Sequence, residues 1–145
     1  LIKKYKCRVF LVGSPDDRAL CEQVLSFVKD FQHEYVQEKV INVAGETSLR
    51  GFYSLVKRSR LMVSNDSAPV HYACAARIPV VAVFGPTVPA LGYAPITKNS
   101  RIAELDLPCR PCGTHGARVC PLLHFRCMKE LTAEDVMKKV SELEV

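Results

Sequence analysis

The sequence predicts an α/β fold, in which a parallel sheet carries helices on both faces. Short β-branched runs alternate along the chain with longer segments whose apolar residues recur at helical spacing. The last of these runs, residues 78–85 (IPVVAVFG), is apolar almost throughout, as is typical of a strand buried on both faces of a parallel sheet. The chain has 145 residues, 48% of them apolar, which suffices for one domain with a substantial core.

The first half of the chain predicts two strands and two helices. Residues 7–13 (CRVFLVG) form a β-branched run that ends in glycine. Ser14 and Pro15 then suit the N-cap and the first position of a helix that continues to about Phe31. Residues 39–45 (KVINVAG) predict the second strand, and residues 47–59 predict a helix that begins with capping residues.

The second half predicts two more strands and two more helices. The strands are residues 60–64 (RLMVS) and the apolar run at 78–85. Between them lies a short helix over residues 67–77 with a proline near its start. Residues 132–145 (TAEDVMKKVSELEV) predict a closing helix, because valines and a leucine recur on one face.

Polar turns follow all four predicted strands, at residues 13–17, 44–48, 64–67 and 85–87. Parallel strands point the same way, so these turns are expected at the carboxyl edge of the sheet, where α/β folds bind ligands. Asn-Asp-Ser after one strand and Gly-Pro-Thr after the next indicate a binding site rather than packing alone.

Residues 65–71 (NDSAPVH) have the features of an anion-binding helix start. A helix N-terminus presents unpaired N–H groups and a partial positive charge, and the small Ser67 and Ala68 allow a phosphate to approach them. Asp66 would repel a phosphate unless its carboxylate turned back to cap the helix, and the two roles can coexist. His71 is either a structural partner or a donor to the phosphate. Neither a GxGxxG fingerprint nor a Walker lysine is present.

Residues 47–87, followed by PCRPCG, CP, RCM and LTAEDV, resemble the C-terminal domain of ADP-heptose:lipopolysaccharide heptosyltransferases. The similarity covers nearly the whole chain and rests on the Asp-Ser-x-Pro-x-His turn, the Phe-Gly-Pro-Thr exit and the late cysteines. It implies a Rossmann-like domain, the C-terminal half of a GT-B fold, which binds a nucleotide-diphospho-sugar. The chain departs from the family at Ala68, where relatives usually have glycine, and at Val88, where they often have aspartate.

The resemblance also implies roles for individual residues. The donor diphosphate would lie at the start of the helix, and Asp16 would accept hydrogen bonds from the ribose. The turn that contains Thr47 would lie near the adenine. The remaining residues that the resemblance assigns to the donor site are Asp66, Ser67, Ala68, Pro69, Val70, His71, Gly85, Pro86 and Thr87.

By the same resemblance, the chain would bind the sugar donor, ADP-heptose, for transfer to the inner core of lipopolysaccharide, and the full-length protein rather than this chain alone would be the active glycosyltransferase. No catalytic residue is expected in this chain, because relatives carry the base in an N-terminal acceptor domain. No cofactor is required, and no nucleic-acid partner is expected. The enzyme would be cytoplasmic, with peripheral contact to the inner membrane.

The chain is expected to be a fragment. It does not begin with Met, and its first residues (LIKKY) look like the end of an amphipathic helix. Residues 1–145 would then form a single nucleotide-sugar-binding domain with a Cys-rich loop at residues 107–129, and the acceptor domain and first strand would precede them. No run reaches about 18 apolar residues, and no signal peptide is visible.

The Cys-rich loop permits two interpretations. Seven cysteines are an odd number, which argues against a secreted disulfide scaffold. Four thiolates at the spacing seen in this loop could close a tetrahedral zinc site, or they could be reduced thiols in a structural loop. The four are Cys109, Cys112, Cys120 and Cys127.

The chain has a net charge of +5, and the Cys-rich loop has an excess of basic residues and no acid. Such a patch favours an anionic partner, unless its counter-charges lie elsewhere in the fold. The alternative function is therefore a zinc-stabilised module whose basic face binds nucleic acid or another anionic partner. A third interpretation of the function is a nucleotide-binding domain without catalysis of its own. The basic residues are Arg110, Arg118, Arg126 and Lys129.

Overall fold

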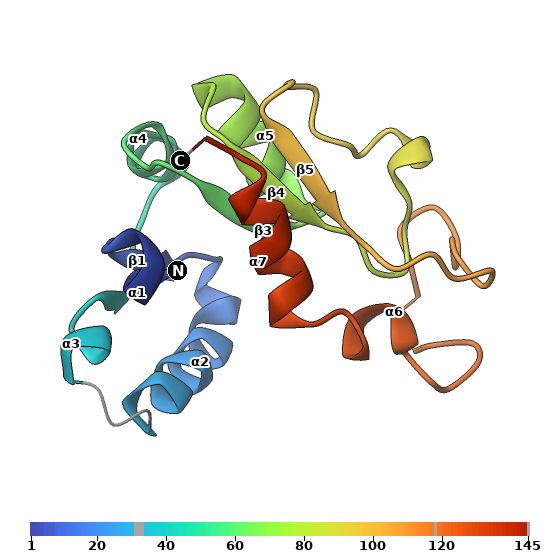
Figure 1. Cartoon of the computed structure of the whole chain (residues 1–145), viewed down its shortest axis with the longest axis horizontal. Helices are drawn as coiled ribbons and strands as arrows, with labels where there is room; N and C mark the ends of the chain where they lie inside the picture. The colour runs from blue at the N-terminus through green and yellow to red at the C-terminus, as the bar shows by residue number, and fades with distance from the viewer. Residues whose placement is uncertain (31–33, 118, 145) are drawn as a thin grey trace. The chain divides into compact units, whose positions relative to one another are not determined.

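The computed structural model describes residues 1–30, 34–117 and 119–144. The chain divides into two compact units, Leu1–Phe52 and Tyr53–Val145, and the boundary falls within helix α4 (Leu49–Lys57). Both units contain parallel strands flanked by helices (Figure 1). The predicted fold class is therefore confirmed.

The first unit is built around a parallel pair of short strands. Strand β1 pairs with β2 so that Val9 lies opposite Val40 and Leu11 lies opposite Asn42. A parallel pair needs a crossover connection, and helix α2 provides most of it. The elements are α1 (Ile2–Tyr5), β1 (Val9–Leu11), η1 (Pro15–Asp17), α2 (Arg18–Asp30), α3 (Glu34–Gln37) and β2 (Val40–Asn42).

The helical segment after β1 begins with a single 3₁₀ turn, as its sequence favours. Ser14 is the N-cap of that turn, and its backbone N–H and hydroxyl both donate to the Asp17 carboxylate, at 2.8 and 2.7 Å. The expected helix end at Phe31 lies outside the described residues. Leu20 and Val24, which recur at helical spacing in this segment, are 61% and 42% exposed. The apolar spacing thus predicted the helix correctly, but it did not predict how exposed these two side chains are.

The second unit contains a three-stranded parallel sheet in the order β3-β4-β5. Met62 lies opposite Val80, and Val80 lies opposite Ser100 on the other side. Helix α5 packs on β3 and β4, and helix α7 packs on β4 and β5 (Figure 1). The elements are β3 (Met62–Asn65), α5 (Ala68–Ala76), β4 (Val80–Val83), η2 (Pro89–Leu91), β5 (Ser100–Ala103), α6 (Arg126–Lys129) and α7 (Ala133–Ser141).

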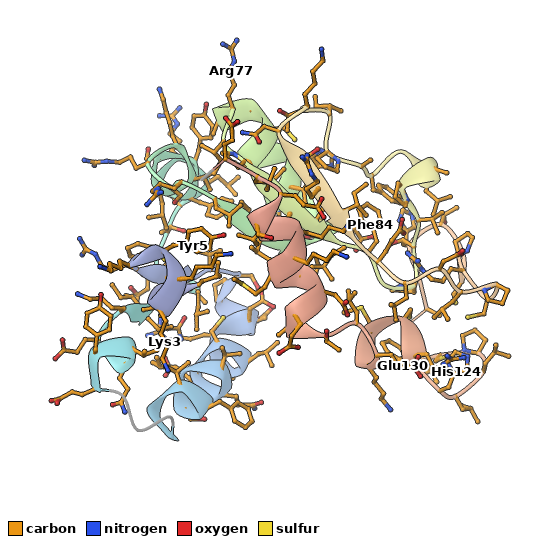
Figure 2. The ribbon with its side chains drawn as sticks, in the orientation of Figure 1. Lys3, Tyr5, Arg77, Phe84, His124 and Glu130 are labelled. Carbon is orange, nitrogen blue, oxygen red and sulfur yellow. The ribbon has the colours of Figure 1, made fainter. Side chains whose placement is uncertain are left out.

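The apolar run predicted as a doubly buried strand is the central strand of this sheet. Val80, Val81 and Ala82 are fully buried, and so is Phe84 directly after the strand. Figure 2 shows Phe84 within the second unit, and His124 and Glu130 at the α6 end of that unit. Val70 from α5 and Val140 from α7 complete this core. The position of β4 fixes where the turn that follows it leaves the sheet.

The hydrogen-bonded ladders differ from the predicted sheet in two respects. The four predicted strands are present, but β1 pairs only with β2, while β3 and β4 belong to a separate ladder. That second ladder includes β5, which the sequence did not predict. No helix among the described residues combines the length and the apolar character needed to cross a bilayer.

Candidate functional site

The turn between β3 and α5 lies at the carboxyl edge of the three-stranded sheet. Ser67 is the N-cap of α5 in an extended conformation, and its side chain does not cap the helix. Of the N–H groups predicted to face a phosphate, that of Ser67 donates to Asn65 O at 2.7 Å and that of Val70 donates to Ser67 O at 3.0 Å. Pro69 has no N–H. The Ala68 N–H has no acceptor within the described part of the chain.

A hydrogen bond joins this turn to the turn after β4. The Thr87 hydroxyl donates to the Asp66 carboxylate, and the Asp66 N–H donates to Val83 O at 3.1 Å. Thr87 is only 3% exposed. The Asp66 carboxylate is thus bonded to the neighbouring turn and does not cap α5. The structure therefore joins the turn after β3 to the turn after β4. The spacing of residues in the sequence could not predict this side-chain contact.

A buried arginine shapes the Gly85-Pro86-Thr87 turn. The Arg110 side chain is 4% exposed, and its guanidinium donates to Gly85 O at 2.5 Å and to Thr87 O at 2.7 Å. It also bonds to Leu105 O and forms an ion pair with Glu104 at 2.8 Å. A planar guanidinium with five donors suits such a set of acceptors. Sequence reasoning assigned Arg110 to a basic surface patch, whereas the structure makes it an internal support of the turn.

The Cys-rich loop packs against the same turn. Cys112 N–H donates to Pro86 O at 2.8 Å. Gly116 has φ +73°, and a Cβ on it would lie 2.6 Å from Pro86 Cγ, so only glycine fits that close approach. A Cβ on Gly85 would likewise lie 2.2 Å from Met128 Sδ, so the two chain segments are in tight contact. The loop is therefore part of the environment of the turn after β4.

These segments line an open pocket of about 160 Å³. Three of its lining residues, Asp66, Pro86 and Thr87, belong to the site that the sequence predicted. The other two, Tyr93 and His115, were not predicted, because they lie in irregular segments without periodicity or a motif. Of the other predicted residues of the second unit, Gly85 is buried, and Ser67, Ala68 and His71 are exposed; none of them lines this pocket.

The two predicted site residues of the first unit lie on its surface turns. Asp16, in η1, is exposed, and Thr47, between β2 and α4, is exposed as well. The turns after β1 and β2 are joined, since Gly45 N–H donates to Gly13 O at 3.0 Å. Arg18, which the sequence did not single out, donates to Ala44 O at 3.0 Å and to Glu46 at 2.8 Å.

The Asp17 carboxylate, in the turn after β1, is held by hydrogen bonds from Ser14. The Ser14 hydroxyl and then the Ser14 N–H hold the pKa of the Asp17 carboxyl below its ordinary value. Asp17 is thus a capping residue, and one of its carboxylate oxygens accepts both hydrogen bonds from Ser14. Asp16, the predicted ribose partner, is the neighbouring carboxylate and remains a prediction.

The four cysteines of the Cys-rich loop are free thiols with different environments. A hydrogen bond from the Phe125 N–H lowers the pKa of Cys120, against a smaller effect of burial, and further backbone N–H groups nearby act in the same direction. Burial, followed by the nearby Cys112, raises the pKa of Cys127. Within the described residues, no three His, Cys, Asp or Glu side chains are placed to hold a metal ion. The zinc interpretation thus gains no support from the geometry.

Two of the basic residues in the loop have counter-charges within the fold. Arg110 pairs with Glu104, and Arg126 pairs with Glu130 at 2.7 Å one helical turn later. Arg118 lies outside the described residues. The structure therefore favours internal pairing over a free anion-binding patch for Arg110 and Arg126.

The fold and the paired polar turns define the class of the protein as an α/β domain with parallel strands and a polar site at their carboxyl edge. The fold matches the solved structure of the E. coli ADP-heptose lps heptosyltransferase II, with a TM-score of 0.62 and 24% identity over 92% of this chain. It also matches the solved structure of a family 9 glycosyl transferase from Veillonella parvula, with a TM-score of 0.68 and 20% identity over 96% of this chain. This chain covers 37% of each of those two chains.

The chain belongs to glycosyltransferase family 9 (heptosyltransferase), whose model matches residues 1–123. It is similar to the lipooligosaccharide heptosyltransferase 2 of Campylobacter jejuni, with 30% identity over 141 residues and 97% of this chain. The chain spans 42% of the length of that relative, so the match concerns less than half of the relative's sequence.

Proposed function

We propose that this chain supplies the donor-binding part of an enzyme that transfers heptose from ADP-heptose to the inner core of lipopolysaccharide. Membership of the heptosyltransferase family supports this proposal. The observation that carries it is the bond between Thr87 and Asp66, which joins two polar turns at the carboxyl edge of a parallel sheet and beside a pocket.

The diphosphate of the donor would lie at the start of α5. There the Ala68 N–H is available, and the helix dipole favours negative charge. The Asp66 carboxylate does not cap the helix, but the Thr87 hydroxyl donates to it and offsets part of its repulsion of a phosphate. Glycosyl transfer leaves a nucleoside diphosphate, whose negative charge grows as the sugar departs. A fixed N–H group and a helix N-terminus stabilise that charge without needing to reorganise. Asp16 would accept hydrogen bonds from the ribose, and the turn with Thr47 would lie near the adenine.

The acceptor hydroxyl must lose a proton to a base within hydrogen-bond reach. Asp66 is bonded to Thr87 and Asp17 to Ser14, so neither carboxylate is a free base. We expect the base to come from an acceptor domain outside this chain, and this chain alone to be inactive. The whole enzyme would work at the cytoplasmic face of the inner membrane, with no cofactor and no nucleic acid.

A nucleotide panel tests the proposal. Isothermal titration of the chain with ADP, GDP, UDP and ADP-heptose should show binding of the two adenine nucleotides and weaker or no binding of the others. Equal affinity for all four, or no binding of any, would contradict the donor site. A labelled oligonucleotide titrated in the same buffer tests the alternative of a basic nucleic-acid module, and tight, salt-dependent binding would favour that alternative.

Metal analysis completes the comparison with the zinc-stabilised module. Protein purified without chelator should carry less than about half an equivalent of zinc, and chelation should leave its unfolding midpoint unchanged. A full equivalent of zinc whose removal unfolds the Cys-rich loop would show instead that the four thiolates form a metal site.

A further inference from the structure

Tyr93 and His115 form a bonded pair at the pocket beside Asp66. Tyr93 follows η2, and His115 lies in the Cys-rich loop, 22 residues later. The Tyr93 hydroxyl lies 3.0 Å from His115 Nδ1, and the two rings are 5.9 Å apart at an interplanar angle of 37°. Neither residue belongs to the site that the family motifs define.

The position of His115 is fixed from both sides along the chain. Three residues before it, Cys112 N–H donates to Pro86 O at 2.8 Å, and directly after it Gly116 packs on Pro86. Both anchors hold the loop to the turn that carries Thr87. The imidazole is therefore delivered to the pocket by the same turn that bonds to Asp66, although the ring itself is exposed.

The lining of the pocket suits a sugar better than a phosphate or a base. Asp66 presents a carboxylate, which accepts bonds from hydroxyls and repels a phosphate. The Tyr93 ring and Pro86 offer apolar faces for the C–H groups of a pyranose, and Tyr93 adds a hydroxyl. When that hydroxyl donates to His115 Nδ1, the imidazole carries its proton on Nε2, and that N–H is left to donate to a sugar oxygen.

We propose that Tyr93 and His115 are specificity-determining residues that hold the transferred sugar of the donor. The inference rests on the proposed donor function. The sugar would lie between the Tyr93–His115 pair and Asp66, while the diphosphate lies at the start of α5. The pair would act on the sugar alone, so its loss would weaken binding of the nucleotide-sugar without changing binding of the nucleotide.

The test compares affinities of the full chain for ADP and for ADP-heptose by isothermal titration. Tyr93→Phe and His115→Ala should leave ADP affinity within about twofold, and should weaken ADP-heptose binding about five- to tenfold, the effect of one lost hydrogen bond. His115→Gln keeps a donor near the position of Nε2 and should recover most of the loss. Matched controls are Tyr35→Phe in the first unit and His124→Gln in the same loop, neither of which lines the pocket.

The outcomes separate the inference from the proposed function. If the unmodified chain binds ADP and the variants bind ADP-heptose as well as it does, the inference is overturned and the donor site stands. If the unmodified chain binds neither ligand, the donor site itself is wrong and the inference falls with it. Tyr93→Phe is nearly isosteric and keeps the test valid if His115→Ala fails to fold, which circular dichroism would detect.

Discussion

The Thr87 hydroxyl donates to the carboxylate of Asp66, so the turns after β3 and β4 are bonded to each other through side chains. Thr87 is almost completely buried, and its backbone carbonyl accepts a hydrogen bond from Arg110 at 2.7 Å. One residue thus connects the start of α5, the turn after β4 and the Cys-rich loop.

Thr87→Val removes the hydroxyl and keeps the shape of the side chain. The Asp66 carboxylate then loses its partner in a partly buried position, so the free energy of unfolding should fall by about 1–3 kcal/mol. Urea denaturation measures this. Thr114→Val, at an exposed threonine of the Cys-rich loop, is the matched control and should change stability little. Equal stability of the two variants would mean that the bond contributes nothing.

Ala68→Val adds two methyl groups at the first residue of α5. The larger side chain should crowd the one N–H that is available at this turn, and ADP binding should weaken by about tenfold, as for one lost charge-assisted hydrogen bond. Isothermal titration measures the affinity. Ala133→Val is the same change at the exposed first residue of α7 and should leave ADP affinity unaltered. If both variants bind ADP like the unmodified chain, the phosphates do not lie at Ala68.

Arg110→Ala should destabilise the second unit strongly. The variant removes a buried side chain that donates to two carbonyl groups of the turn after β4, and each carbonyl left without a donor costs about 1–3 kcal/mol. Arg126→Ala breaks an exposed ion pair with Glu130, four residues later, and should not shift the unfolding midpoint measurably. Similar midpoints for the two variants would show that Arg110 does not support the turn.

Cys120 should react at a lower pH than Cys127, the other thiol of the Cys-rich loop with a shifted pKa. Backbone N–H groups, that of Phe125 foremost, favour its thiolate and lower its pKa, whereas burial raises the pKa of Cys127. Because the thiolate is the nucleophile, alkylation of Cys120 should begin at a lower pH than alkylation of Cys127. Mass spectrometry after brief iodoacetamide treatment at a series of pH values checks this order. Simultaneous alkylation of both, or Cys127 first, would contradict it.

The sequence predicted the elements that have long apolar or capped patterns. Strand β4 was predicted from an unbroken apolar run, and it is the buried centre of its sheet. Strand β5 was missed because Ser100-Arg101-Ile102-Ala103 is short and carries a charge at an edge of the sheet. The Arg101 guanidinium forms an ion pair with Glu142, directly after α7, at 3.1 Å. The local sequence around Arg101 does not predict a partner 41 residues away.

The site was predicted in part for a similar reason. Asp66 and Thr87 lie in motifs that follow strands, so the sequence could place both at one edge of the sheet. Their mutual bond depends on the register of β3 and β4, which the sequence did not give directly. The support that Arg110 gives to the turn and the place of His115 in the pocket were not predicted. The turn carbonyls of Gly85 and Thr87 that Arg110 bonds, and the Tyr93 partner of His115, are more than 20 residues away in irregular segments. Burial of a charge in a loop follows from tertiary contacts, which periodicity does not report.

The most direct test of the donor site is a nuclear magnetic resonance titration of this 16.2 kDa chain with ADP. We predict saturable shifts of the backbone amides of Asp66, Ala68 and Thr87. Adenosine, which has no phosphates, should leave the Ala68 amide unmoved at the same concentrations. Saturable ADP binding that leaves the Ala68 amide unmoved, or the absence of any ADP-dependent shift at the three amides, would contradict the proposal that the donor diphosphate lies at the start of α5.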